Sequence, residues 1–208
     1  MADFLQYSLE ELRKSAVEVL RTGQGTRPDV LLIDVDGKRA ILKDQNACDR
    51  WFAMLIGPLL CWREARALKR LEAISGVPRL LTKPDARSLL MEYVDAEQAI
   101  KTQQVQDWQA WFDRLEQLIQ CMHEAGIAHG DLRSPGNMLI DKQGNPVLVD
   151  FVASSGQGAR WNIFANSIFR GLCAVDESAV IKLKSKIAPE LLDNAAASNH
   201  VGGKVGLL

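Results

Sequence analysis

The residues best suited to chemistry lie in one stretch of the chain, from His129 to Phe151. Asp131 and Asn137 fall in a loop that leads into a strand-like run, and Asp150 ends the next such run after a turn. Carboxylate and amide oxygens are hard ligands, and Mg²⁺ takes one or two of them together with the phosphate oxygens of a substrate. We therefore expect Asn137 and Asp150 to hold Mg²⁺, and Asp131 to accept a proton from an attacking hydroxyl.

The N-terminal part of the chain has the residue pattern of a small β-sheet. Three β-branched or aliphatic runs predict strands at 17–20, 30–35 and 39–43. Asp36 and Gly37, between the second and third runs, predict a type I′ hairpin, because that turn needs positive φ at both central residues. Residues 22–26 are Gly-rich and can bring bare backbone N–H groups close to a ligand. The sequence therefore predicts an early antiparallel sheet with a candidate binding loop.

Helical periodicity becomes stronger further along the chain. A helix that includes 60–71 is expected to end near Ser75 and Gly76. Two further strand-like runs, 79–82 and 88–94, are parted by the turn-forming pair Pro84 and Asp85. The remaining expected elements are a helix over 104–125, two short strands around a turn at 141–146, a loop at 153–159 and a helical tail over 160–194.

Strands cluster early and helices late, which predicts an α+β fold with two lobes. The expected N-terminal lobe, residues 1–95, contains the antiparallel sheet and one main helix. The expected C-terminal lobe, residues 96–208, is a reduced helical lobe that carries the loop with Asp131 and the metal pair.

Composition excludes several classes of protein. The chain has 208 residues and a formal net charge of −1, so no strong positive field would gather nucleic acid. No window holds the 18 or more apolar residues that a spanning helix needs, and the N-terminus lacks the basic start and apolar run of a secretion signal. The four cysteines are scattered, which favours free thiols in a reducing compartment. A cytoplasmic protein is expected, with no nucleic-acid partner.

The stretch HGDLRSPGN, followed by VLVDF, resembles the catalytic loop and metal-binding Asp-Phe of the protein-kinase-like superfamily. The resemblance implies an ATP- and Mg²⁺-dependent kinase with a minimal two-lobed fold. It also implies that Lys43, in the run AILK, contacts the α/β-phosphates of the nucleotide and that Glu64 is the partner of this lysine.

The same resemblance assigns the nucleotide's remaining contacts. Gly23 and Gly25 are similar to the loop that covers the phosphates, and the run MEYV is similar to the hinge, where the backbone of Glu92 and Val94 would bind adenine. Taken alone, the two glycines are equally well explained as a flexible turn. His129 is expected to be structural, holding the catalytic loop by hydrogen bonds.

Within the superfamily, HGDL and the compact tail look like the small bacterial branch, which includes lipopolysaccharide-core heptose and Kdo kinases together with RIO-type kinases. We favour a sugar of the lipopolysaccharide core or a related glycolipid as acceptor, with a RIO-like serine/threonine kinase as the alternative. The aromatic residues and lysines of the tail pack on the lobe by default. A minority alternative is peripheral contact with the inner membrane.

Two departures from the family pattern leave a third alternative open, a pseudokinase with a regulatory or scaffolding role. Five residues separate Asp131 from Asn137 where the family usually has four, so the loop must bulge near Ser134 and Pro135. Val152 follows the Asp-Phe pair in place of glycine, which reduces backbone freedom there.

Overall fold

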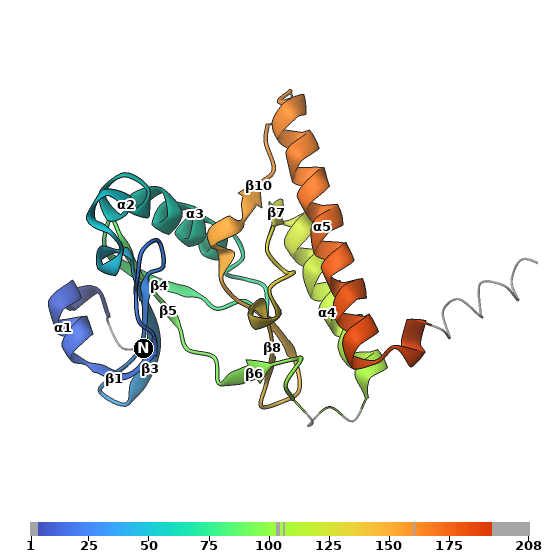
Figure 1. The fold of residues 1–208 in the computed structure, drawn as a ribbon, viewed down its shortest axis with the longest axis horizontal. Coiled ribbons are helices and arrows are strands. Elements are labelled where there is room, and N and C mark those ends of the chain that lie inside the picture. Colours follow the sequence, from blue (N-terminus) through green and yellow to red (C-terminus); the bar gives the residue numbers. More distant parts are fainter. Residues whose placement is uncertain (1–3, 103–104, 106, 160, 193–208) are drawn as a thin grey trace, which may run out of the picture.

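A computed structural model describes residues 4–102, 105, 107–159 and 161–192, and it confirms the expected α+β class (Figure 1). The strands are β1 (Ala16–Arg21), β2 (Asp29–Val35), β3 (Lys38–Asp44), β4 (Leu80–Asp85), β5 (Ser88–Glu92), β6 (Ala96–Gln98), β7 (Ile127–Ala128), β8 (Met138–Asp141), β9 (Pro146–Leu148) and β10 (Ser155–Gly156). The helices are α1 (Leu9–Lys14), α2 (Arg50–Leu55), α3 (Gly57–Arg70), α4 (Trp108–Glu124) and α5 (Ile163–Ile187). No helix among these residues is long and apolar enough to cross a bilayer.

The first five strands form one antiparallel sheet in the order β1-β2-β3-β5-β4. The β2–β3 hairpin turns at Asp36 and Gly37, whose φ angles are 53° and 75°, as the type I′ prediction requires. The chain then leaves this sheet, because β6 pairs with β8 in a separate three-stranded sheet of order β6-β8-β9. The short strand β6 has no periodic pattern and was not predicted. The division of the chain into lobes at residue 95 stays a prediction.

The turn between β4 and β5 corrects a prediction. Pro84 and Asp85 were expected to form this turn, but both lie in β4 and the chain turns at Ala86 and Arg87. Since β4 is an edge strand of the sheet, a proline there need not interrupt the hydrogen-bonded ladder. The Asp85 side chain closes the turn by accepting hydrogen bonds from the Arg87 amide at 2.8 Å and the Ser88 hydroxyl at 2.6 Å.

The helix boundaries also differ from the prediction. Helix α4 begins at Trp108, not at residue 104, because Asp107 caps it by accepting a hydrogen bond from the Ala110 amide at 3.0 Å. Helix α3 ends at Arg70, and turns carry the chain on to Gly76. The predicted tail helix is confirmed over α5, and residues 160, 193 and 194 of that prediction lie outside the described residues.

The main hydrophobic core joins the two halves of the chain. It contains buried residues from α3 and β5 together with residues from α4, β8 and α5. Helices α4 and α5 run side by side (Figure 1). Helix α4 contacts β9 of the three-stranded sheet, and both helices contact β7, which pairs with β10 in a two-stranded sheet. A smaller core lies under α1 on the other face of the first sheet. This continuous packing fixes the first sheet relative to the loop that carries Asp131.

Candidate active site

The predicted general base lies in the loop between β7 and β8. Gly130 turns the chain there with φ of 78°, a left-handed conformation that a residue without Cβ adopts readily. A Cβ at this position would lie 2.9 Å from the Ala153 carbonyl oxygen, so the close approach also requires glycine. Leu132 is fully buried, whereas Asp131 is exposed. The loop is therefore fixed on both sides of a carboxylate that is open to solvent.

The extra loop residue is absorbed by a short 3-10 turn over Pro135–Asn137. The Asn137 amide donates to the Ser134 carbonyl oxygen at 3.0 Å, which folds the chain back toward the start of the loop. The side-chain nitrogen of Asn137 then donates to the backbone oxygen of Asp131 at 2.8 Å and to its Oδ2 at 3.1 Å. The longer spacing therefore still brings Asn137 to Asp131.

The β8–β9 hairpin places Val149, the residue before Asp150, beside Asn137. Strand pairing ends with the Val149 amide donating to the Asn137 carbonyl oxygen at 3.1 Å. Asp150 follows in a left-handed conformation, with φ of 68° and ψ of 65°, which costs a residue with a Cβ roughly 1–2 kcal/mol. Such strain persists only where surrounding contacts hold it, and it is common at functional sites. Val152 lies in the following 3-10 turn with a negative φ, so this position needs no glycine.

Lys43 joins the first sheet to this second region. Its Nζ lies 2.5 Å from Oε1 of Glu64 on α3 and 2.9 Å from Oδ1 of Asp150. The side chains of Lys43 and Glu64 are 10% and 1% exposed, and that of Asp150 is 32% exposed. The three groups are therefore a largely buried charge cluster that opens to solvent at Asp150.

The pKa directions follow from how the charges are shared. Burial alone would lower the pKa of Lys43, but Glu64 and Asp150 outweigh it and raise the pKa above its ordinary value. Burial also acts to raise the pKa of Asp150, but attraction to Lys43 outweighs it and lowers that pKa. Complete burial raises the pKa of Glu64, which shares the single ammonium with Asp150. Asp150 is thus kept ionised at neutral pH.

The donor set beside the cluster fits Mg²⁺. Hydrogen bonds from the described residues use the Asn137 side-chain nitrogen and Oδ1 of Asp150, and none is made to the Asn137 side-chain oxygen or to Oδ2 of Asp150. No group of three or more His, Cys, Asp and Glu side chains that could hold a metal ion occurs in the part of the chain that the structure describes. Two protein oxygens suit Mg²⁺ in particular, because it completes its shell with water and substrate phosphates.

His129 supports the loop through its ring. Nε2 lies 2.9 Å from the Val149 carbonyl oxygen, and Nδ1 lies 3.3 Å from the Asp131 amide nitrogen. Since a carbonyl only accepts and an amide only donates, these contacts assign the proton to Nε2. Burial lowers the pKa of His129 and keeps the ring neutral, and the ring also packs against Phe151 with centroids 4.7 Å apart. These contacts are those of a structural residue.

Sequence reasoning missed Asp176, a fully buried carboxylate in α5. Oδ2 accepts a hydrogen bond from the His129 amide at 2.7 Å, and Oδ1 accepts one from the Gly130 amide at 2.9 Å. Nε2 of His123 lies 3.1 Å from Oδ2. The carboxylate of Asp176 therefore accepts hydrogen bonds from two consecutive amides of the loop that carries Asp131. The only signal in the sequence is an acidic residue among the apolar positions of a helix.

We expect Asp176→Ala to lower the free energy of unfolding by about 2–4 kcal/mol, because two buried amides lose their acceptor. Urea denaturation measures this change. Glu177→Ala is the matched control, since Glu177 is the exposed neighbour on the same helix, and we expect it to change stability by less than about 0.5 kcal/mol. Equal effects of the two substitutions would contradict the assigned role of Asp176.

The two predicted phosphate-loop glycines both have structural reasons to be glycine. A Cβ at Gly23 would lie 2.7 Å from Cβ of Ala47. The Gly23 amide donates a hydrogen bond to Oδ1 of Asp29 at 2.5 Å. Gly25 has φ of 62°, and its carbonyl oxygen accepts a hydrogen bond from the Asp49 amide at 2.8 Å. The loop is therefore bound to the residues that precede α2, and its contact with phosphates stays a prediction.

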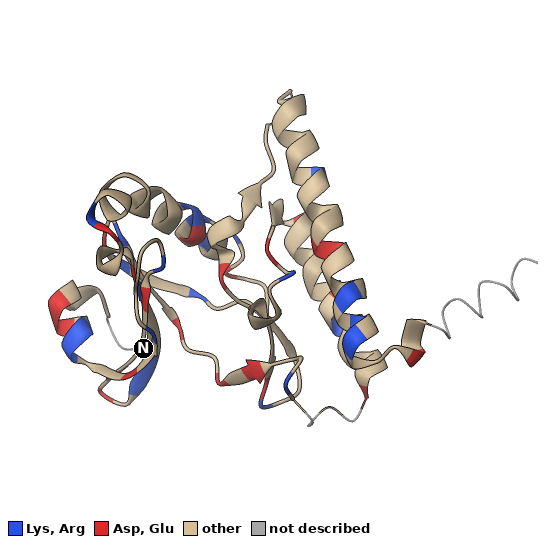
Figure 2. Ribbon diagram, in the orientation of Figure 1, with Lys and Arg blue, Asp and Glu red and all other residues tan. Residues whose placement is uncertain are grey.

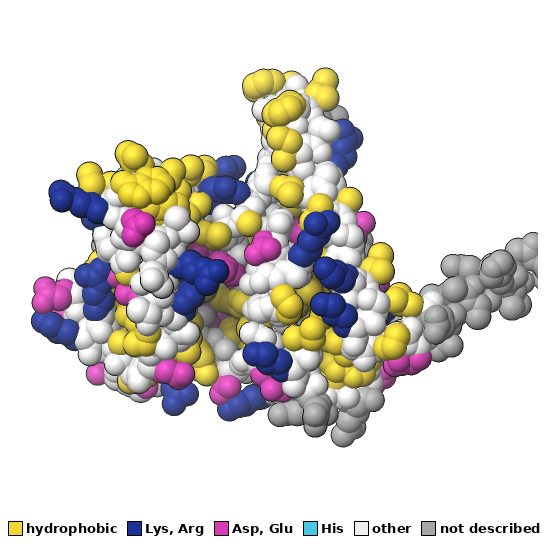
Figure 3. All heavy atoms as spheres, viewed as in Figure 1, with side chains coloured by type: hydrophobic (Ala, Val, Ile, Leu, Met, Phe, Trp, Pro, Cys, Tyr) yellow, Lys and Arg dark blue, Asp and Glu magenta, His cyan; other side chains and the backbone are white. Residues whose placement is uncertain are grey.

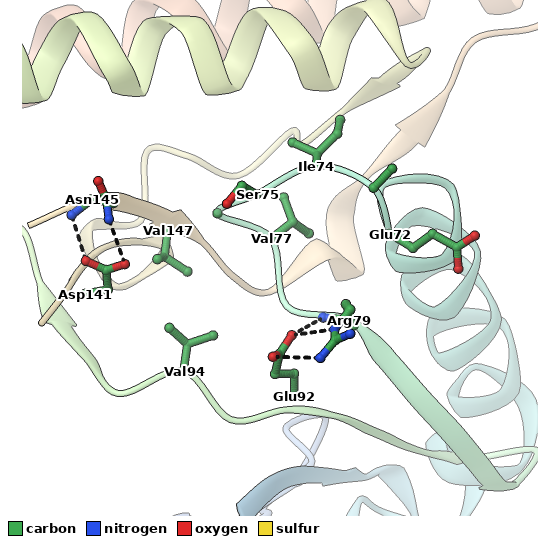
Figure 4. A pocket seen from close by; sticks show the side chains of 12 residues that line it. Glu72, Ile74, Ser75, Val77, Arg79, Glu92, Val94, Asp141, Asn145 and Val147 are labelled. Carbon is green, nitrogen blue, oxygen red and sulfur yellow. Dashed lines mark hydrogen bonds and ion pairs between the residues drawn. The ribbon is translucent and has the colours of Figure 1, made fainter. Parts of the chain in front are cut away.

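The predicted hinge connects β5 to β6. The Glu92 amide donates to the Arg79 carbonyl oxygen at 2.9 Å, so this amide is already engaged within the chain. The Glu92 side chain makes an ion pair with Arg79 at 3.1 Å and lines, with Val94, a pocket of about 420 Å³ (Figure 4). Asp141 and Asn145 close the opposite side of this pocket. Adenine binding by the backbone of Glu92 and Val94 stays a prediction.

Comparison with known proteins shows the family. A model of the RIO domain matches residues 54–157, a range that contains Glu64, the hinge, Asp131, Asn137 and Asp150. Lys43 and the glycines lie before the matched range. No curated protein matches the sequence.

Two solved structures of the Rio2 kinase from Chaetomium thermophilum share the fold, one of them described as an ADP/Mg²⁺-phosphoaspartate complex. Each has a TM-score of 0.63 and 20% sequence identity, over 86% and 85% of this chain. This chain spans 58% and 59% of the length of those two chains. Of the two branches that the sequence resembles, these matches fall in the RIO-like one. The chain belongs to the RIO domain family, with a protein-kinase-like fold.

Proposed function

We propose that this chain is an ATP- and Mg²⁺-dependent phosphotransferase whose acceptor is a hydroxyl group. The observation that carries the proposal is the 2.9 Å contact between Lys43 and Asp150. This contact places the Lys43 ammonium, which can bind nucleotide phosphates, next to the Asp150 carboxylate, which can bind Mg²⁺. Membership of the RIO family, and the ADP and Mg²⁺ in the matched Rio2 complex, support the same assignment.

In this proposal Lys43 binds the α/β-phosphates and is positioned by Glu64. Bound Mg²⁺, held by Asn137 and Asp150, would neutralise charge on the phosphate oxygens. Asp131 orients the acceptor and takes its proton as the hydroxyl oxygen bonds to the γ-phosphorus, while the bond to the ADP oxygen breaks. The protein supplies mainly position and electrostatic stabilisation, which suits the loose transition state of phosphoryl transfer.

Two acceptor classes fit this chemistry. Family membership favours a serine or threonine hydroxyl of a protein. The exposed aromatic residues that begin α5 favour the other class, a hydroxyl of a lipopolysaccharide-core sugar or related glycolipid presented at the inner membrane. Incubation with radiolabelled γ-phosphate ATP separates them, since label in protein bands supports the first acceptor and label in the lipid extract supports the second.

A thermal-shift titration tests nucleotide binding. A site occupied at about 100 times its Kd adds about 2.7 kcal/mol of stability. For a chain of this size we therefore expect ATP with Mg²⁺ to raise the melting temperature by about 5–10 °C. The shift should fall when Mg²⁺ is omitted and in Asp150→Asn.

The pseudokinase alternative predicts a different response of the melting temperature to ATP and Mg²⁺. The absence of any shift at millimolar ATP with Mg²⁺ would overturn the proposed function and leave a scaffolding role. A shift that is the same with and without Mg²⁺ would indicate nucleotide binding without transfer.

A further inference from the structure

Two groups of large apolar side chains are exposed on one side of the molecule. The first, which we call the α2–α3 ridge, has members that are each at least 49% exposed: Trp51, Met54, Leu55, Leu59 and Trp62. The second, the α5 tip, has members that are each at least 76% exposed: Trp161, Ile163 and Phe164. Figure 3 shows both as hydrophobic patches at the same edge of the molecule, over α2–α3 and over the start of α5.

A pocket of about 310 Å³ opens between α3 and β10, at the foot of the ridge. Trp62, Arg63 and Arg66 line it from α3, and residues 154–156 line it from the other side. Strand β10 also contacts α5, so this arginine pocket lies between the two apolar groups.

The two arginines of this pocket have no carboxylate partner among the described residues. One terminal nitrogen of Arg63 donates to the carbonyl oxygens of Ala153 and Ser154 at 3.0 Å and 2.8 Å. The Arg66 guanidinium lies 5.3 Å from the centre of the Trp62 ring and is exposed. Both positive charges therefore remain uncompensated within the described structure, and Arg66 is free to contact an anion.

The charges around the apolar groups point to one kind of surface. Helix α3 carries four basic residues and a single acidic one, Glu64, which is buried against Lys43 (Figure 2). From Gln157 to Val175 the sequence contains no Asp or Glu. Asp49, at the start of α2, is an exposed carboxylate beside the ridge, but basic residues outnumber acidic ones on α2 and α3. Aromatic and aliphatic anchors beside basic residues match the interface of an anionic bilayer, where anchors enter the acyl boundary and cations contact lipid phosphates.

We propose that the α2–α3 ridge and the α5 tip dock onto an anionic lipid surface, with a lipid phosphate bound in the arginine pocket. Only ten residues lie between Asp150 and Trp161 in the sequence, so docking would hold the catalytic loop close to the bilayer. Docking itself is independent of the proposed phosphotransfer. Its consequence, a preference for a membrane-bound hydroxyl, rests on that proposed function.

Flotation with vesicles tests the docking. We expect the full chain to float with phosphatidylcholine vesicles that contain about one third phosphatidylglycerol. With vesicles of phosphatidylcholine alone, we expect it to remain in the bottom fraction of the gradient. Arg66→Glu and Phe164→Glu should each weaken partitioning by at least about tenfold, since one reverses a charge at the surface and the other removes an anchor. Salt of about 1 M should reduce binding, because it screens charges beyond about 3 Å.

Two matched controls test the location of the surface. Ile181→Glu changes an apolar residue of α5 that is 59% exposed but lies far from the tip, and Lys38→Glu reverses an exposed charge on β3. We expect both to bind vesicles as the unaltered chain does. Unchanged ATP-induced thermal shifts in all four variants would show that the fold and the nucleotide site are intact, which separates failure of docking from failure of the proposed function.

Three results would overturn the docking proposal. The first is no flotation of the unaltered chain with anionic vesicles. The second is equal binding by Arg66→Glu, Phe164→Glu and the two controls. The third is a dimer in sedimentation equilibrium that Phe164→Glu dissociates, which would assign the apolar groups to contact between two copies of the chain.

Discussion

Replacement of Asp131 by alanine is expected to slow ATP turnover by about 10²–10⁴-fold while leaving nucleotide affinity nearly unchanged. The Asp131 carboxylate is exposed and receives a hydrogen bond from the Asn137 side chain at 3.1 Å, so it is oriented but still open to an acceptor. The substitution removes the carboxylate that we propose as the proton acceptor. The Asp131 backbone oxygen still accepts from Asn137 at 2.8 Å, so the loop should keep its shape.

The measurement combines initial rates of ADP release and autophosphorylation with a titration of nucleotide binding. Asp113→Ala is the matched control, since Asp113 is an exposed carboxylate on α4 outside the site. We expect the control to turn over ATP at the rate of the unaltered chain. An unchanged rate in Asp131→Ala would remove this residue from the mechanism, even if the nucleotide still binds.

Replacement of Lys43 by methionine is expected to have two separable effects. Nucleotide binding should weaken by about 10–100-fold, because hydrogen bonds to charged groups contribute about 1.5–3 kcal/mol. The fold should also lose about 3–5 kcal/mol, because Glu64 would remain buried without its partner. Isothermal titration calorimetry measures the first effect and urea denaturation the second.

The double variant Lys43→Met with Glu64→Gln separates stability from binding. It replaces the buried pair by uncharged groups of similar size, and such replacements are often neutral for stability. We expect it to regain most of the stability lost in Lys43→Met but none of the nucleotide affinity. Recovery of both would show that Lys43 acts only as a structural partner of Glu64.

Local chemistry explains why parts of the site could be predicted. The pair Asp36 and Gly37 makes its turn with neighbouring residues only, so its positive φ angles follow from residue type. Asp131, Asn137 and Asp150 lie within one loop and one hairpin, where spacing and strand register decide the geometry. The prediction of a turn at Pro84 was wrong because a proline can also lie in an edge strand. No local sequence pattern shows whether a strand lies at the edge of a sheet.

The amino-acid sequence by itself determined the fold class, the early hairpin and the order of the polar groups in the loop that carries Asp131, because each depends on short-range turn and strand preferences. Only the tertiary structure decided that Lys43 contacts Asp150, 107 residues further along the chain, and that Asp176 supports the amides of His129 and Gly130. These contacts arise from packing of α3 against β4 and β5 of the first sheet and of α5 against β7 and β10. Burial then sets the strength of each charge interaction, and burial is a property of the whole packed molecule.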